Sequence, residues 1–396
     1  MTCHAVGATD LTVTEHYVSG GADVGAANGK GQTALHLAVN LNRVEAVQLL
    51  CENGAQSWRR DAHGVTALMG AAEHGLDKIL AILLRHGHSA AAEHHRLPER
   101  GVTPMMLACA GSGGQPGHLS VLRLLLAAGE SVLDTTVHLQ SALHMAAYYN
   151  HFDAATLLLL GGSLVNGRTV QGDTPLHCAA HHGNTDLVVL LLQWGADPNN
   201  LTDHGKTALH SAMYAGSGSC IAATICGGAD IRTRDRHGRA LIDYLAHQSV
   251  AVTRSVEHIV DIPNLRDDFG NGLLHLAARA DNYALAHFLC ASGAADPNST
   301  NTVGDTPLHE AVREVYSDVV EVLIRSEASI YIPNRQGDSA LDLSRRFYAG
   351  GLETNNDGQA CCRAVQDRHA YVGVLLAVQD MEVQQVRESI GPLLCV

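Results

Sequence analysis

The strongest constraint on the fold of this chain is a tetrapeptide that occurs twice, four periods apart. Thr174-Pro175-Leu176-His177 returns at residues 306–309, and 306 − 174 = 132 = 4 × 33. Aligning the chain with itself on the leucine of this motif gives equivalent positions at Leu35, Leu68, Met105, Leu143, Leu176, Leu209, Leu241, Leu274, Leu308 and Leu341. Their successive spacings are 33, 37, 38, 33, 33, 32, 33, 34 and 33 residues. Such a period predicts an array of repeats in which each unit packs on its neighbours.

Each period predicts two helices and a loop. Thr174 is suited to cap a helix, and Pro175 is tolerated in its first turn, where no amide donor is needed. Gly183 favours the end of that helix, because glycine adopts a left-handed backbone at little cost. The apolar run of residues 187–192 predicts a second, buried helix that ends near Gly195. An Asp/Asn-rich turn then leads to the next unit.

These motifs resemble the ankyrin repeat. The 33-residue period with Thr-Pro-Leu-His-x-Ala and Leu-Leu-x-x-Gly-Ala-Asp is similar to that family over roughly residues 28 to 345. The resemblance implies an all-α ankyrin-repeat solenoid of about ten units plus caps, built from helix pairs with hairpin-like loops. It also implies that loops and first helices line a concave binding face. The motif is specific for the fold and says little about the ligand.

Departures from the repeat suggest the domain organisation. We expect residues 1–27 to form an N-terminal capping half-repeat, residues 28–352 the array, and residues 353–396 a linker and a C-terminal helical segment. The segment either caps the array or docks a partner. The unit at residues 235–264 is degenerate, which suggests a flexible junction near residues 242–264. Insertions at residues 88–100 and 111–117 should be surface loops.

Composition argues against several classes of function. The formal charge is 26 − 40 = −14, with no block of consecutive Lys or Arg, so we expect no nucleic-acid partner. No segment is apolar for about 18 residues, so no membrane insertion is expected. The ten Cys form no C-x-x-C pair, and no hydrolase, kinase or Walker signature occurs. Cys220 and Cys226 are expected in the core. We therefore expect no catalytic residues, metal site, cofactor or small-molecule substrate.

Most of the 25 histidines have a structural explanation. In ankyrin-like repeats the histidine of the motif bonds backbone groups of adjoining loops, and this position is held by His36, His144, His177, His210, His275 and His309. His63, His204 and His237 precede a glycine in the loop, and we expect them to face solvent.

The residues after the Ala-Ala step of each first helix are free to specify a partner. Of the ten Tyr, three fall on two neighbouring parts of this stripe, and tyrosine is favoured at interface hot spots. The predicted partner-binding residues are Tyr148, Tyr149, His181, His182, Tyr214, His247, Arg279 and Arg313. The alternative is that the tyrosines pack within the array. The two arginines favour an acidic partner segment, and a charged rim is expected from Asp173, His204, Lys206, Arg239, Asp305 and Asp338.

Together these observations predict a non-catalytic protein–protein interaction scaffold or adaptor that binds a protein partner on the concave face. Two alternatives stay open. One is a regulatory or targeting subunit of an enzyme complex, and the other is a structural component of a cytoskeletal or ciliary assembly. A cytoplasmic location fits the lack of an N-terminal signal and the scattered cysteines.

Overall fold

The computed structural model describes residues 15–16, 18–86, 96–97, 99–111, 118–350, 372–373 and 375–381, with the backbone alone for residues 347–350. Within these residues the regular secondary structure is helical, accompanied by isolated β-bridges in the loops. This confirms the all-α prediction. The chain divides into two compact units, Met1–Ser211 with Gly227–Ala229, and Ala212–Cys226 with Asp230–Val396.

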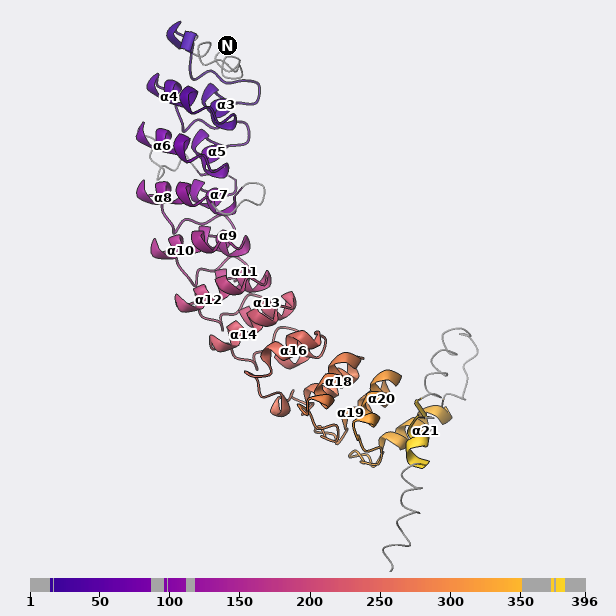
Figure 1. The fold of residues 1–396 in the computed structure, drawn as a ribbon. Coiled ribbons are helices and arrows are strands. Elements are labelled where there is room, and N and C mark those ends of the chain that lie inside the picture. Colours follow the sequence, from indigo (N-terminus) through magenta and orange to yellow (C-terminus); the bar gives the residue numbers. More distant parts are fainter. Residues whose placement is uncertain are drawn as a thin grey trace, which may run out of the picture. The chain divides into compact units, whose positions relative to one another are not determined.

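The first unit is a succession of helix pairs (Figure 1). Its first helices have seven residues each and are α3 Ala34–Asn40, α5 Ala67–Glu73, α7 Pro104–Ala110, α9 Ala142–Tyr148 and α11 Pro175–His181. Its second helices have nine residues each and are α4 Val44–Glu52, α6 Asp77–Arg85, α8 Leu119–Ala127, α10 Phe152–Leu160 and α12 Thr185–Gln193. The first helices pack on one another in sequence order, and so do the second helices.

Helix α13, Ala208–Ala215, contains residues of both units. The second unit continues with α14 Gly218–Cys226, α15 Leu241–Leu245, α16 Val250–Val256, the 3-10 helix η2 Ile262–Asn264, α17 Leu273–Arg279, α18 Tyr283–Ala291, α19 Pro307–Arg313, α20 Ser317–Arg325 and α21 Ala340–Gly350. Its helices α17, α19 and α21 also pack in sequence order.

The fifth repeat shows why this sequence forms a helix pair. Thr174 is the N-cap of α11 and Pro175 its first residue, as predicted. Ala179 and Ala180 are fully buried, because the small side chains allow neighbouring helices to approach closely. Leu187 of α12 is fully buried as well, and burying one such side chain contributes about 2 kcal/mol. The core therefore lies between the two helix layers and continues from repeat to repeat.

The seventh repeat corrects the predicted register by one residue. We aligned Leu241 with Leu176, but the N-cap of α15 is Ala240, whose N–H donates to the carboxylate of Asp243 at 2.8 Å. Ile242 is therefore the equivalent of Leu176, and Asp243 stands where the motif has histidine. The first helix of this repeat has only five residues.

Apolar side chains are buried near both ends of the described chain. Val18, within the region expected to cap the array, is one of them. In residues 375–381, which are helical, Leu376 is fully buried. Asp380 accepts a hydrogen bond of 2.5 Å from the Tyr331 hydroxyl and pairs with Arg345 at 3.3 Å. Residues 87–95 and 112–117, which hold most of the two predicted insertions, lie outside the described residues, as does most of residues 353–396.

Candidate functional site

The C-terminal ends of α9 and α11 carry four of the predicted partner-binding residues. Tyr148 is the last residue of α9 and Tyr149 is its C-cap, while His181 and His182 hold the same two places on α11. Each first helix ends here because the next residue but one adopts a left-handed backbone, with φ 61° at Asn150. The two tyrosines are 49% and 48% exposed, so they do not serve the core.

The four rings form one continuous cluster across two repeats. The ring centroids of Tyr148 and His182 are 4.2 Å apart with an interplanar angle of 57°. Tyr148 also meets Tyr149 edge-on at 4.9 Å, and His181 meets His182 at 5.1 Å. Such tilted and edge-to-face contacts are favourable geometries for aromatic pairs. We call Tyr148, Tyr149, His181 and His182 the aromatic cluster.

The imidazoles of the aromatic cluster interact with nearby polar groups. His182 Nδ1 lies 3.0 Å from the carbonyl oxygen of Cys178, which can only accept, so Nδ1 donates this hydrogen bond. The pKa of His181 is lowered from its usual value, first by burial and then by the neighbouring His182 and Lys206. The cluster therefore combines aromatic ring faces with polar ring edges.

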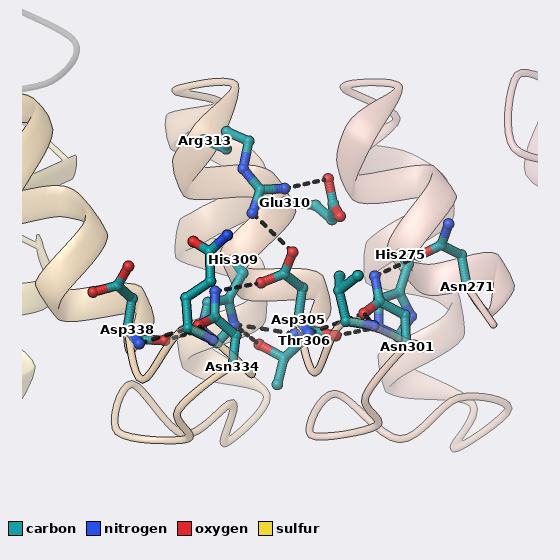
Figure 2. A network of polar contacts seen from close by, with 12 residues as sticks. Asn271, His275, Asn301, Asp305, Thr306, His309, Glu310, Arg313, Asn334 and Asp338 are labelled. Atoms are coloured by element: carbon teal, nitrogen blue, oxygen red, sulfur yellow. Dashed lines mark hydrogen bonds and ion pairs between the residues drawn. The ribbon is translucent and has the colours of Figure 1, made fainter. Parts of the chain in front are cut away.

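The other predicted residues lie in the second unit, and the structure brings them to different environments. Tyr214 on α13 is 69% exposed. His247 and Arg279 are exposed as well. The guanidinium of Arg313, in contrast, is engaged within the chain. It donates to Asp305 at 2.8 Å and pairs with Glu310 at 3.2 Å (Figure 2).

The predicted charged rim is wrong for Asp305 and Asp338, which are 3% and 8% exposed. Figure 2 shows Asp305 between Arg313 and Asn334, whose amide donates to it at 2.9 Å. Burial alone would raise the pKa of Asp305, but these hydrogen bonds outweigh it and lower the pKa. Asp338 likewise accepts from Arg346. The backbone carbonyls of Asp305 and Asp338 also accept hydrogen bonds from the motif histidines of the preceding repeats, His275 and His309.

The motif histidines tie each repeat to the loop of the next, as predicted. Nδ1 of His177 accepts the Thr174 N–H at 3.3 Å, so its Nε2 carries the proton and donates to the Lys206 carbonyl at 3.1 Å. The same two bonds are made by His36, His144, His275 and His309. Nδ1 of His210 likewise accepts the Thr207 N–H at 3.1 Å. His63, His204 and His237 are exposed, as expected.

Two residues were misjudged or missed from the sequence. Cys226 is exposed at the end of α14, although Cys220 is buried as expected. Glu130 was missed: it is 6% exposed and occupies a position that is alanine at Ala196. One carboxylate oxygen accepts the Met105 N–H at 3.0 Å, and burial raises the pKa of Glu130 to about 7. The sequence signal that could have revealed Glu130 is a carboxylate at a repeat position where a small apolar residue is expected.

In the described part of the chain, no three or more His, Cys, Asp or Glu side chains gather in a way that could hold a metal ion. None of the described helices has the length and apolar character needed to cross a membrane.

Comparison with known proteins gives the same repeats. A family model described as ankyrin repeats (three copies) matches residues 3–95, 88–169, 143–235 and 241–334. The chain is 37% identical over 116 residues, 29% of its length, to the nuclear factor NF-kappa-B p105 subunit of Gallus gallus. It is 35% identical over 107 residues, 25% of its length, to the B-cell lymphoma 3 protein homolog of Mus musculus.

These matches cover 11% and 24% of the two relatives, so they concern a part of each protein. Ankyrin repeats are protein-interaction modules and are generally not catalytic. The family model covers well over half of the sequence, and the helix pairs and motif histidines follow the same 33-residue order. This chain belongs to the ankyrin-repeat family.

Proposed function

We propose that this protein is a non-catalytic scaffold or adaptor whose first-helix face binds a protein partner at the aromatic cluster. The observation that carries the proposal is the set of ring contacts from Tyr149 through Tyr148 and His182 to His181. Two neighbouring repeats contribute to it, and its two tyrosines stay about half exposed.

The chemistry of the cluster fits an interface hot spot. Tyrosine brings a large ring with few rotatable bonds, so its immobilisation on binding costs little conformational entropy. The ring contacts already restrain Tyr148 and His182 before a partner arrives, which lowers that cost further. Polar ring edges, such as that of His182, can direct hydrogen bonds to the partner.

The proposal is tested by affinity capture with crosslinking and quantitative mass spectrometry. We compare the wild type with one variant that carries four substitutions together, Tyr148→Ala, Tyr149→Ala, His181→Ala and His182→Ala. Circular dichroism first shows that both proteins are folded. The matched control is Tyr283→Ala with His287→Ala, a stacked pair on the second helix α18 whose tyrosine is 48% exposed. Selective loss of a partner only in the first variant is expected. An unchanged partner set would contradict the proposal.

A regulatory or targeting subunit of an enzyme complex is the second candidate, and the C-terminal segment favours it. Residues 372–381 are helical where described and contact the last repeat through Asp380. Deleting residues 360–390 should then abolish co-purification with a catalytic chain. Fractionation with the cytoskeleton would instead support a structural component, and a freely soluble fraction would support a cytoplasmic adaptor.

A further inference from the structure

Most hairpin loops of this array share one turn. In it, the fourth residue donates its N–H to the carbonyl of the first and has a positive φ, as at Gly172, with φ 81° and a bond of 2.9 Å to Thr169. The third hairpin is one residue longer, and there Gly101 donates to Leu97. Glycine suits this place because it lacks the Cβ that makes a left-handed backbone unfavourable. The equivalent residue is glycine at Gly31, Gly64, Gly172, Gly205, Gly238, Gly270, Gly304 and Gly337.

The fourth hairpin breaks this pattern with a leucine. Leu139 adopts φ 59° and donates to Thr136 at 2.9 Å, so it makes the same turn with a branched side chain. Its side chain is 48% exposed and therefore gains little from the core. Val315 also has a positive φ, but it lies half-buried between α19 and α20, where packing offsets the strain. Leu139 is too exposed for packing in the core to offset the strain of its left-handed backbone in the same way.

Two exposed valines lie next to this leucine. Val137 in the same hairpin is 55% exposed, and Val170 in the next hairpin is 54% exposed. The Val170 N–H donates to the His138 carbonyl at 3.0 Å, which fixes the two tips side by side. Single exposed apolar residues are ordinary on protein surfaces. Here three exposed apolar side chains lie on adjoining hairpin tips, and one of them has a strained backbone. Such a patch is unfavourable in water and indicates an interaction site.

Two arginines, Arg100 and Arg168, flank the patch formed by Val137, Leu139 and Val170. The Val137 N–H donates to the carbonyl of Arg100 at 3.1 Å, so Arg100 lies on the adjacent tip, and within the described residues its guanidinium makes no ion pair. Arg168, in the hairpin of Val170, reaches the carboxylate of Asp203 at 3.8 Å and is 46% exposed. Arg100 and Arg168 thus place cationic groups next to the patch on two sides, although the carboxylate of Asp203 lies beside Arg168 and the chain has a net charge of −14.

We infer that Val137, Leu139 and Val170 form a second docking surface, which binds a partner segment with large apolar side chains next to carboxylates. The apolar groups cover the tip patch, and the carboxylates face Arg100 and Arg168. This surface precedes the N-terminus of α9, whereas the aromatic cluster lies at its C-terminal end. A seven-residue helix separates them by about 10 Å, so the two surfaces can be tested separately.

The test uses Leu139→Gly, which restores the turn residue of the other hairpins and removes the apolar side chain. Displayed random peptides are selected against the wild-type protein. We expect the enriched peptides to carry large apolar residues beside Asp or Glu. Their affinity, measured by fluorescence polarisation, should fall at least tenfold for Leu139→Gly and for Arg100→Glu. Leu139→Gly should also melt higher, by about 2 °C, because the backbone strain is relieved.

Val303→Ser is the matched control, since Val303 is a 53% exposed valine on another hairpin tip. It should bind the peptides as the wild type does, and so should the variant without the aromatic cluster. Three outcomes overturn the inference: no peptide family is enriched, the enriched peptides are basic or bind Leu139→Gly equally well, or Leu139→Gly melts below the wild type. None of these outcomes bears on binding at the aromatic cluster.

Discussion

Single buried polar residues decide how firmly one repeat holds the next. His177 satisfies its own N-cap amide and also the carbonyl of Lys206 in the following loop. Asp243, at the same position of the seventh repeat, accepts the cap amide but has no proton to give to the next loop. Glu130 leaves one buried oxygen without a partner among the described residues. Unpaired buried groups of this kind cost stability.

The motif histidines predict that the array loses stability in acid. Burial lowers the folded pKa values of five of them from 6.5, namely His36, His144, His177, His275 and His309, and that of His275 falls to about 4. As pH falls, the unfolded chain takes up the proton first. The free energy of unfolding should therefore decrease between about pH 6.5 and 4, by up to about 3 kcal/mol for His275 alone. Urea unfolding measures this slope, and an NMR titration of His275 above pH 6.5 would contradict it.

Glu130 predicts the opposite dependence. Burial raises its pKa from 4.5 to about 7, so its contribution to stability is lost as pH rises through that range. Glu130→Gln keeps an acceptor for the Met105 N–H without the charge. It should be about 1–3 kcal/mol more stable than the wild type at pH 8 and nearly equal at pH 4.5. Urea unfolding at both pH values tests this, with the exposed Glu99→Gln as control. Equal stability at pH 8 would rule it out.

At the scale of the element, the repeats differ in how well their helices are fixed. The first helix of the seventh repeat has only five residues. Its loop is joined to the loop of the eighth repeat by an ion pair between Arg234 and Asp268 at 2.8 Å. Asp268 is 74% exposed on its side chain, and an ion pair with so exposed a partner contributes less than about 1 kcal/mol. A weaker interface should open more often than its neighbours.

Amide hydrogen exchange should therefore be faster in α15 and α16 than in α11 and α12. The expected difference is at least tenfold in exchange rate, which corresponds to about 1.4 kcal/mol of local opening free energy. Mass spectrometry of peptides from residues 241–256 and 175–193 gives the comparison within one sample. Equal protection of the two segments would show that the seventh repeat is as stable as the fifth.

The sequence predicts most elements because the motif residues have direct local roles. Thr174, Pro175 and His177 fix the start of a helix, and the 33-residue period places the next one. The register error at Leu241 arose where Ala240 and Asp243 replace the motif threonine and histidine, since the adjacent Leu241 and Ile242 then fit the leucine position equally well. Leu139 interrupts a regular series of glycines that the sequence displays, but its exposure required the structure.

At the scale of the whole molecule, both proposed binding surfaces lie where neighbouring repeats adjoin. Tyr148 and His182 are 34 residues apart in sequence, and the stacking of α9 on α11 brings their rings to 4.2 Å. Repeat arithmetic predicted that these residues share a stripe. The ring geometry depends on side-chain rotamers, which the sequence does not determine. Arg313 shows the same limit, because its pairing with Asp305 is invisible in the repeat pattern.

The most direct test of the central claim is site-specific photocrosslinking from the aromatic cluster. A photoreactive phenylalanine replaces Tyr149 in one version of the full chain and Tyr283 in another, since the two tyrosines are equally exposed at 48%. Irradiation in cell extract is expected to join a protein to position 149. Unlabelled wild type should compete with this product, and position 283 should yield no such product. Crosslinks from position 283 alone, or equal ones from both positions, would contradict partner binding at the first-helix face.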